Sequence, residues 1–202
     1  LMWEGRRVGS VIEDDDARYA ILAGLLPADT RASRGEQARS LFEQMDQVLA
    51  PAGMSFYDIV RTWLYCDRIL EWYDELNRVR NTFFAERGVY DRLVPASTGV
   101  GTANPYGAAL VGEALAIRPK RRNISIHSLP SPLQCPAPAY GSSFSRAVEV
   151  RLPAYRRLYV SGTASRPLAC INWLKLRAAA ISPPSGINRR RLSLSAGRCS
   201  PR

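Results

Sequence analysis

The apolar and polar residues of this chain alternate in stretches that predict strands and helices in turn. Segments 7–12 and 17–26 are apolar and flank the acidic turn Glu13–Asp16, a pattern that predicts a β-hairpin. The segment Tyr57–Cys66 is rich in β-branched and aromatic residues, which favour a buried strand. A further apolar run, Ala109–Ile117, predicts another strand.

Two helices are predicted between these strands. The first begins at Ser33, which forms with Glu36 an S-x-x-E capping box that satisfies two free N–H groups, and it ends before Pro51. Its apolar face comprises Ala38, Leu41, Phe42, Met45, Val48 and Leu49. The second helix spans about residues 70–86, with an apolar stripe of Trp72, Leu76, Val79 and Phe83. The stretch Val94–Gly101 supplies a further strand between the second helix and Ala109–Ile117. The resulting order ββαβαββ is typical of an α+β protein with a mixed sheet and two helices on one face.

Changes in composition along the chain divide it into parts. Residues 1–117 are predicted to form one domain. Residues 118–140 begin with a basic cluster and continue with a proline-rich stretch, so they are predicted to form a linker. Residues 141–165 repeat the opening strand–turn–strand pattern, since a constant offset aligns Arg18–Gly24 with Arg156–Gly162. They are interpreted as the opening hairpin of a second, similar domain. Two unrelated hairpins are the alternative interpretation.

The net charge of +10 is concentrated in the last segment. Residues 166–202 hold seven Arg, one Lys and no acidic residue, which leaves 20 basic and 18 acidic side chains for residues 1–165. This low-complexity segment is predicted to be a disordered basic tail, either natural or the product of a frameshift or truncation near residue 165. The nearly neutral remainder disfavours nucleic-acid binding, which needs clustered cations on a folded face.

Several classes of protein are disfavoured by features that the sequence lacks. No apolar run approaches the roughly 18 residues of a membrane span, and the first 16 residues are acidic where a signal peptide needs an apolar centre. A cytoplasmic protein is therefore expected. The cysteines and the single histidine are not paired at zinc-ligand spacing, and no phosphate loop or dinucleotide fingerprint occurs, so neither a metal nor a cofactor is predicted.

Four segments follow one another in a characteristic order: EQARSLFEQMDQVLAPAGMSFYDIVRTWLYCDRI, YDELNRVRNTFFAERG, VPASTGVG and ALVGEALAI. In this order and spacing they resemble the Rid family, also called the RidA/YjgF family of imine deaminases and their relatives. The later segment FSRAVEV…RRLYVSGTAS is similar to the opening hairpin of that family. Together with PASTGVG, the tandem layout resembles the chorismatase-like members, which carry two Rid-type domains and cleave the enolpyruvyl ether of chorismate.

This resemblance implies a chorismate-mutase-like (YjgF-like) fold that assembles as a homo-oligomer, either a trimer or, when tandem, a pseudo-trimer. Small-molecule carboxylate ligands then bind in clefts between neighbouring domains. Imine deaminases of the family hold the carboxylate with an arginine in a Pro-x-Arg-Thr pattern, since a guanidinium matches a carboxylate bidentately. Here Pro95 and Ala96 match, but Ser97 occupies the arginine position and is followed by Thr98 and Gly99. The sequence departs from the family at the residue that defines imine deamination.

The candidate site residues each have two interpretations. Ser97–Gly99 form either a small hydroxyl-bearing wall that faces an anionic ligand or a strand whose glycines allow close packing. Glu113 is either the catalytic acid or base or a carboxylate on a solvated strand face. Arg61, inside a strand, either binds the substrate anion or pairs with a helix carboxylate. Tyr106 either borders the substrate cleft or belongs to an ordinary turn.

These features favour a hydrolase that acts on a carboxylate-bearing metabolite, either an enamine or imine or a chorismate-type enol ether. Its activity is expected to be impaired, because the second domain is represented only by its first hairpin, with an exposed sheet edge at Leu158–Ser161. The alternative is a non-catalytic module that binds ligands and oligomerises. RNA binding through the basic tail is the least favoured hypothesis.

Overall fold

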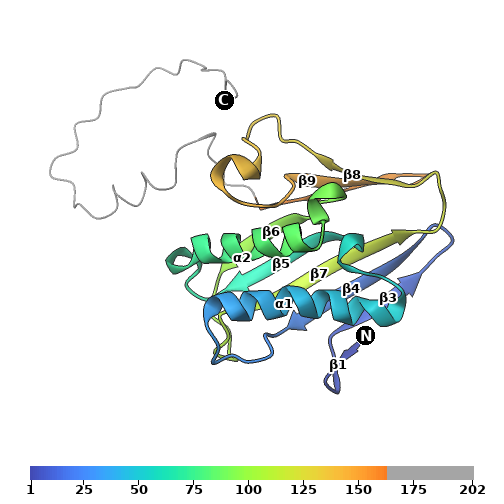
Figure 1. The fold of residues 1–202 in the computed structure, drawn as a ribbon. Coiled ribbons are helices and arrows are strands. Elements are labelled where there is room, and N and C mark those ends of the chain that lie inside the picture. Colours follow the sequence, from blue (N-terminus) through green and yellow to red (C-terminus); the bar gives the residue numbers. More distant parts are fainter. Residues whose placement is uncertain (163–202) are drawn as a thin grey trace, which may run out of the picture. The chain divides into compact units, whose positions relative to one another are not determined.

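A computed structural model describes residues 1–162, and its main feature is a five-stranded mixed sheet (Figure 1). The strands of this sheet are β3 (Gly9–Glu13), β4 (Ala17–Leu25), β5 (Ile59–Cys66), β6 (Ala96–Gly101) and β7 (Leu110–Pro119). Their order is β3-β4-β7-β5-β6, in which only β5 and β6 are parallel. The predicted opening hairpin and the strands near residues 59–66 and 110–117 are confirmed. A short hairpin of β1 (Met2–Trp3) and β2 (Arg6–Arg7) precedes them.

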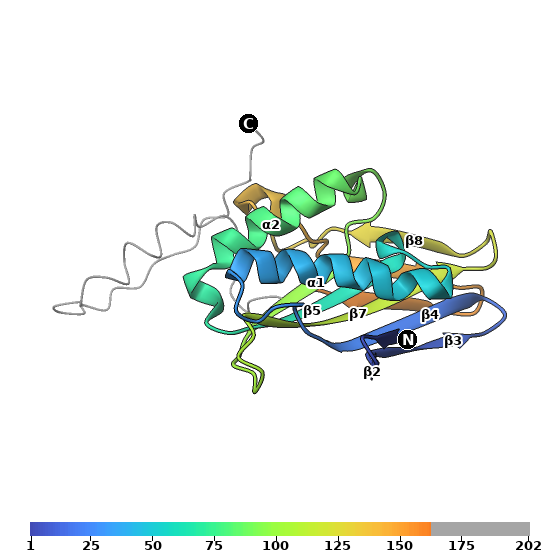
Figure 2. The ribbon, with the colours of Figure 1, turned by 60° about the horizontal axis from the view of Figure 1, so that its bottom comes forward.

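Both helices, α1 (Arg34–Leu49) and α2 (Tyr73–Glu86), lie on one face of this sheet (Figure 2). The predicted α+β class, with a mixed sheet and two helices on one face, is confirmed. The capping box is present, because Ser33 Oγ accepts from the backbone N–H of Glu36 and Glu36 Oε2 accepts from that of Ser33. The second helix begins three residues later than expected, since Ile69–Glu71 form a separate 3₁₀ turn.

We expect the Ser33→Ala substitution to lower the free energy of unfolding by about 1 kcal/mol, because the backbone N–H of Glu36 loses its acceptor and the Glu36 carboxylate loses the Ser33 hydroxyl. Urea denaturation followed by circular dichroism measures the change. Ser125→Ala is the matched control, since Ser125 is an exposed serine that caps no helix and begins the strand Ser125–Leu129. Equal losses in the two variants would contradict a specific role for the capping box.

The core between the helices and the sheet contains a cluster of four phenylalanines. The ring centroids of Phe83 lie 5.6 Å from Phe42 and 5.0 Å from Phe56, and Phe84 packs against all three. All four side chains are buried. The apolar helix stripes that the sequence predicted therefore meet in one core.

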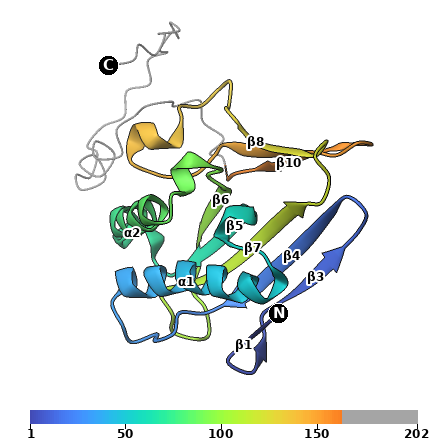
Figure 3. The same ribbon diagram turned by 45° about the vertical axis from the view of Figure 1, so that its right-hand side comes forward.

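A second, three-stranded sheet packs on the opposite face of the first sheet (Figure 3). Its strands, in the order β10-β9-β8, are β8 (Ser125–Leu129), β9 (Ala147–Arg151) and β10 (Arg156–Val160). The contact is apolar and is formed by Ala17, Tyr19, Val60, Ala96 and Ile117 against Ile124, Val148, Val150 and Leu152. Apolar burial of this kind fixes the two sheets against each other.

The strand β8 lies inside the interval 118–140, to which the sequence assigned only a linker. The sequence SIHSL carries a weak strand signal, and β8 forms because it pairs along its length with β9. The division into domains stays a prediction, as does the assignment of β9 and β10 to a second Rid-like domain. The predicted basic tail, residues 166–202, lies outside the described residues.

Neither described helix has the length and hydropathy needed to cross a bilayer. Within residues 1–162, no group of three or more His, Cys, Asp or Glu side chains is placed to hold a metal ion.

Candidate functional site

Polar side chains from three neighbouring strands share the sheet face that points away from the helices. A β-bulge between Ile59 and Arg61 shifts the alternation of β5, so that Ile59 packs in the helix-side core and Arg61 lies on the opposite face. From Arg61 onward, every second residue of β5 then points away from the helices. Trp63 pairs with Thr98 on β6 and with Glu113 on β7, which places all three on this face.

Arg61 is the unusual member of this group, because its guanidinium is buried without a counter-ion. The residue is only 5% exposed. Its Nη2 donates to Thr98 Oγ1, its guanidinium carbon lies 4.7 Å from the Trp63 ring centroid, and its Nη1 is buried with no hydrogen-bond partner among residues 1–162. No carboxylate in the described part of the chain forms an ion pair with it, so the predicted alternative of a helix ion pair is not observed.

Burial lowers the pKa of Arg61, and the nearby Tyr65 opposes this shift. A buried cation that lacks both a carboxylate and one hydrogen bond is unfavourable in a protein that binds nothing there. An anion that accepts a hydrogen bond from Nη1 would remove both defects. Arg61 is therefore suited to hold an anionic ligand. Arg80 on α2 is equally buried and has an unpartnered Nε, but its Nη2 donates to both Asn77 Oδ1 and Ser142 Oγ.

Thr98 connects Arg61 to the end of the second sheet. Its hydroxyl oxygen accepts from Arg61 and, at 2.8 Å, from the backbone N–H of Gly162. One residue earlier, Ser161 Oγ accepts from the backbone N–H of Ser97 at 2.9 Å and donates to the carbonyl of Ser145. The residues that follow β10 thus hold the edge of β6 in place beside Arg61.

Glu113 is neither fully solvated nor buried. The Tyr65 hydroxyl donates to Glu113 Oε2 at 3.2 Å, and both side chains are half-buried. Burial first, and then the neighbouring Glu113 carboxylate, raise the pKa of Tyr65, so the phenol keeps its proton and remains a donor. No residue of the described chain donates to Glu113 Oε1, which leaves this oxygen free to accept a proton or to orient a water molecule.

The other predicted site residues lie elsewhere. Ser97 is buried on the helix side of the sheet, where its hydroxyl accepts from Thr62 Oγ1 at 2.8 Å. Gly99 points the same way, since a Cβ built there would lie 3.0 Å from Ile69 Cδ1. Tyr106 is 56% exposed in the loop between β6 and β7. The structure brings together Arg61, Thr98 and Glu113, and separates them from Ser97, Gly99 and Tyr106.

Sequence reasoning missed Trp63 and Tyr65, which it assigned to a buried strand without a role. The signal was available, because both residues share the period-2 alternation of Arg61 within the strand. They supply the aromatic surface under the guanidinium and the hydrogen bond to Glu113.

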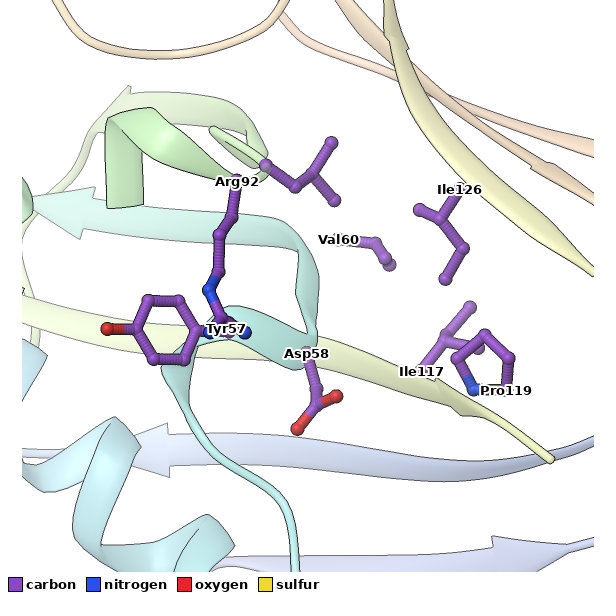
Figure 4. A pocket seen from close by; sticks show the side chains of 8 residues that line it. Tyr57, Asp58, Val60, Arg92, Ile117, Pro119 and Ile126 are labelled. Atoms are coloured by element: carbon purple, nitrogen blue, oxygen red, sulfur yellow. The ribbon is translucent and has the colours of Figure 1, made fainter. Parts of the chain in front are cut away.

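A separate pocket of about 420 Å³ lies where the two sheets meet (Figure 4). It is lined by Tyr57, Asp58, Val60, Arg92, Leu93, Ile117, Pro119 and Ile126. The Arg92 guanidinium lies over the Tyr57 ring, 4.3 Å from its centroid, while the isoleucines line the far side. Asp58 already accepts from the backbone N–H of Ser55 at 2.8 Å. The pocket contains none of the predicted site residues, and its polar groups are satisfied or exposed, so Arg61 remains the stronger candidate.

No protein-family model matches this chain, and no curated protein matches it. Solved structures with a similar fold do exist. A putative endoribonuclease from Thermotoga maritima is 18% identical, with a TM-score of 0.47 over 56% of this chain and 86% of that chain. Escherichia coli TdcF with bound serine is 24% identical, with a TM-score of 0.45 over 54% of this chain and 85% of that chain. The YjgF gene product of E. coli has the same identity, TM-score and coverage as TdcF.

Proposed function

We propose that this chain is a Rid-type small-molecule hydrolase that binds a carboxylate-bearing metabolite at Arg61. The observation that carries this proposal is the buried guanidinium whose Nη1 lacks a partner and which has no counter-ion among residues 1–162. The substrate carboxylate supplies that counter-ion. In this proposal Arg61 takes the place of the arginine that the family resemblance leads one to expect at Ser97, one strand away.

Glu113 is the proposed catalytic residue, and Tyr65 positions it through their hydrogen bond. Two reactions suit this arrangement. Hydrolysis of an enamine or imine adds water to a C=N bond and releases ammonia with a ketone, whereas hydrolysis of a chorismate-type enol ether adds water to a C=C bond and releases an alcohol with pyruvate. Both need one group that moves a proton at the reacting carbon or at water, and Glu113 Oε1 is free for this step. Thr98 completes the substrate-binding group.

We expect this activity to be impaired, because the site lies on a half-open sheet face. Catalysis of both reactions improves when water other than the reactant is excluded. A neighbouring domain, as in the trimer or pseudo-trimer that the family resemblance implies, would close this face. Such assembly is part of the proposal, and sedimentation velocity of the full chain tests it.

The proposal is tested with serine and chorismate as carboxylate probes and with a coupled assay for pyruvate. Serine is chosen because TdcF, a similar structure, was solved with serine bound. Pyruvate release from chorismate without ammonia identifies the enol-ether reaction, whereas release of pyruvate and ammonia from 2-aminoacrylate faster than its spontaneous hydrolysis identifies the imine reaction. We expect Glu113→Gln to abolish pyruvate release while serine or chorismate still binds, because the neutral amide keeps its shape but no longer takes up a proton.

Other outcomes point to the alternatives. Binding of the probes at Arg61 without any turnover would support the non-catalytic ligand-binding module. Turnover that Glu113→Gln leaves unchanged would contradict the catalytic assignment. RNA binding through residues 166–202 is the least favoured function, since residues 1–165 carry almost balanced charge. RNA affinity that survives deletion of that segment would instead place RNA binding on residues 1–165.

A further inference from the structure

The two hairpins that the sequence aligned have the same strand register. The offset that takes Arg18 to Arg156 takes each pair of β3 and β4 to a pair of β9 and β10. In the first hairpin the pairs are Gly9↔Leu22, Ser10↔Ile21, Val11↔Ala20, Ile12↔Tyr19 and Glu13↔Arg18. In the second they are Ala147↔Val160, Val148↔Tyr159, Glu149↔Leu158, Val150↔Arg157 and Arg151↔Arg156. All five pairs correspond.

The backbone hydrogen bonds at the two ends of the hairpins also correspond. At the turn, Asp14 N–H donates to the Ala17 carbonyl, and Leu152 N–H donates to the Tyr155 carbonyl. At the open end, Ala23 N–H donates to the Val8 carbonyl, and Ser161 N–H donates to the Arg146 carbonyl. Both hairpins are closed by a two-residue loop, so the register that the sequence alignment implies is present in both. The two hairpins therefore correspond residue by residue over these strands.

The repeat differs in what lies beside its second strand. In the first hairpin, β4 is paired along its other edge with β7, through Arg18↔Arg118, Ala20↔Ala116 and Leu22↔Ala114. In the second hairpin, β10 is the edge of its sheet, and no strand among residues 1–162 pairs with its outer side. The exposed sheet edge predicted at Leu158–Ser161 is confirmed at Leu158 and Val160, which are 58% and 55% exposed, but not at Ser161, which is buried against β6.

The free edge presents a regular row of backbone groups. In an antiparallel pair, every second residue bonds to its partner strand and the residues between point their N–H and C=O groups outward. Because residues 155 and 161 bond toward β9, the outward groups of β10 are those of Arg156, Leu158 and Val160. They correspond to Arg18, Ala20 and Leu22, the residues opposite β7 in the first repeat.

From this correspondence we propose that the outer edge of β10 is an acceptor site for one extended segment of a separate polypeptide, which adds antiparallel to β10 as β7 adds to β4. Pairing of this kind satisfies the exposed backbone groups and covers Leu158 and Val160. The inference does not depend on the proposed hydrolase function.

Charge defines the partner further. The side chain of Arg156 is 65% exposed and contacts Glu149 at 3.4 Å, but that single carboxylate is shared with Arg151. Arg157 follows, and the sequence contains no acidic residue after Glu149, so the hairpin keeps an excess of positive charge at this end. The position opposite Arg156 corresponds to Arg118 of β7. A strand with β7-like alternation and an acidic residue at that position complements both the edge and its charge. The partner that fits is thus an apolar, alternating segment that ends in an acidic residue.

The test uses a synthetic peptide with the sequence of β7 carrying Arg118→Glu, LVGEALAIEP, added to the full-length chain. We expect saturable binding by fluorescence anisotropy, weakened by salt, and an at least roughly tenfold slowing of amide exchange at Leu158 and Val160. The peptide with its natural Arg118 is expected to bind more weakly, since an arginine then faces Arg156.

Two methylated peptides provide a matched control that leaves the protein unchanged. An N-methyl group at the Ala116 position removes a donor that faces β10, whereas one at the Leu115 position lies on the opposite edge of the peptide. We expect the peptide methylated at the Ala116 position to lose binding and the peptide methylated at the Leu115 position to keep it. We expect the Leu158→Pro protein to bind neither methylated peptide. Equal binding of the two methylated peptides, or no binding of the parent peptide, would overturn the proposal. The chain could instead form a dimer that the Leu158→Pro substitution dissociates, while the peptide does not bind. That result would overturn the proposal and would show that two copies of the chain pair through their β10 edges.

Discussion

Replacing Arg61 by methionine is expected to abolish binding of the carboxylate probes while leaving the fold as stable as before or more stable. The two effects have one cause, because the guanidinium is buried without an ion-pair partner among residues 1–162. Without ligand, the unpaired charge lowers the stability of the fold, so its replacement by an apolar side chain of similar length leaves the free energy of unfolding unchanged or raises it by roughly 1–4 kcal/mol. With ligand, the same charge binds the carboxylate.

The expected loss of affinity is at least about 30-fold, since removal of one partner of a buried, hydrogen-bonded charge pair costs about 2–5 kcal/mol. Isothermal titration with serine and chorismate measures the affinity, and thermal and urea denaturation measure the stability. Arg78→Met is the matched control, because the Arg78 side chain is 70% exposed on α2 and away from the site. A marked loss of stability in Arg61→Met would show instead that Arg61 is structural, held by Thr98 and Trp63.

The second large effect is expected for Phe83→Ala, which should lower the free energy of unfolding by about 3–5 kcal/mol. Phe83 is fully buried between Phe42 and Phe56, at the contact of α1, α2 and the segment before β5. The guanidinium groups of Arg39 and Arg87 also lie over its ring, at 5.3 and 5.4 Å from the centroid. Truncation therefore removes apolar burial, ring contacts and two cation–π contacts together.

Urea denaturation followed by tryptophan fluorescence measures this loss. The control is Tyr106→Ala, since Tyr106 is 56% exposed and makes no ring contact with another described residue. It should change the free energy of unfolding by less than about 0.5 kcal/mol. If Phe83→Ala cost no more than this control, the aromatic cluster could not be the centre of the core.

Local signals made the helices and the first hairpin predictable. The capping box at Ser33 and the two apolar stripes, which contain Phe42 on α1 and Phe83 on α2, depend on residues about one helical turn apart, so the sequence displays them directly. The strand β8 was missed for the opposite reason. Its five residues have little strand preference of their own, and they are extended because they pair with β9 about 20 residues later.

The candidate site divides along the same line. The strand patterns placed Arg61 in a strand and marked Glu113 as a lone carboxylate, whereas Thr98 was singled out only by the family resemblance. These three residues do share one face. The sequence did not predict that the Ser97 side chain would face the helices, because the face on which a β6 side chain lies depends on the register between β5 and β6. Nor did it predict that Trp63 and Tyr65 would complete the site.

Sequence by itself determined the order of the elements from β3 to β7, the capping box at Ser33, the two core stripes and the position of the second hairpin, since each rests on spacing between near neighbours. Only the tertiary structure decided which side chains meet. The bulge at the start of β5 turns Arg61 away from the helices, and the parallel pairing with β6 brings Thr98 to its guanidinium. No described strand pairs with the outer edge of β10. These features depend on pairing between segments far apart in the chain, which no local pattern encodes.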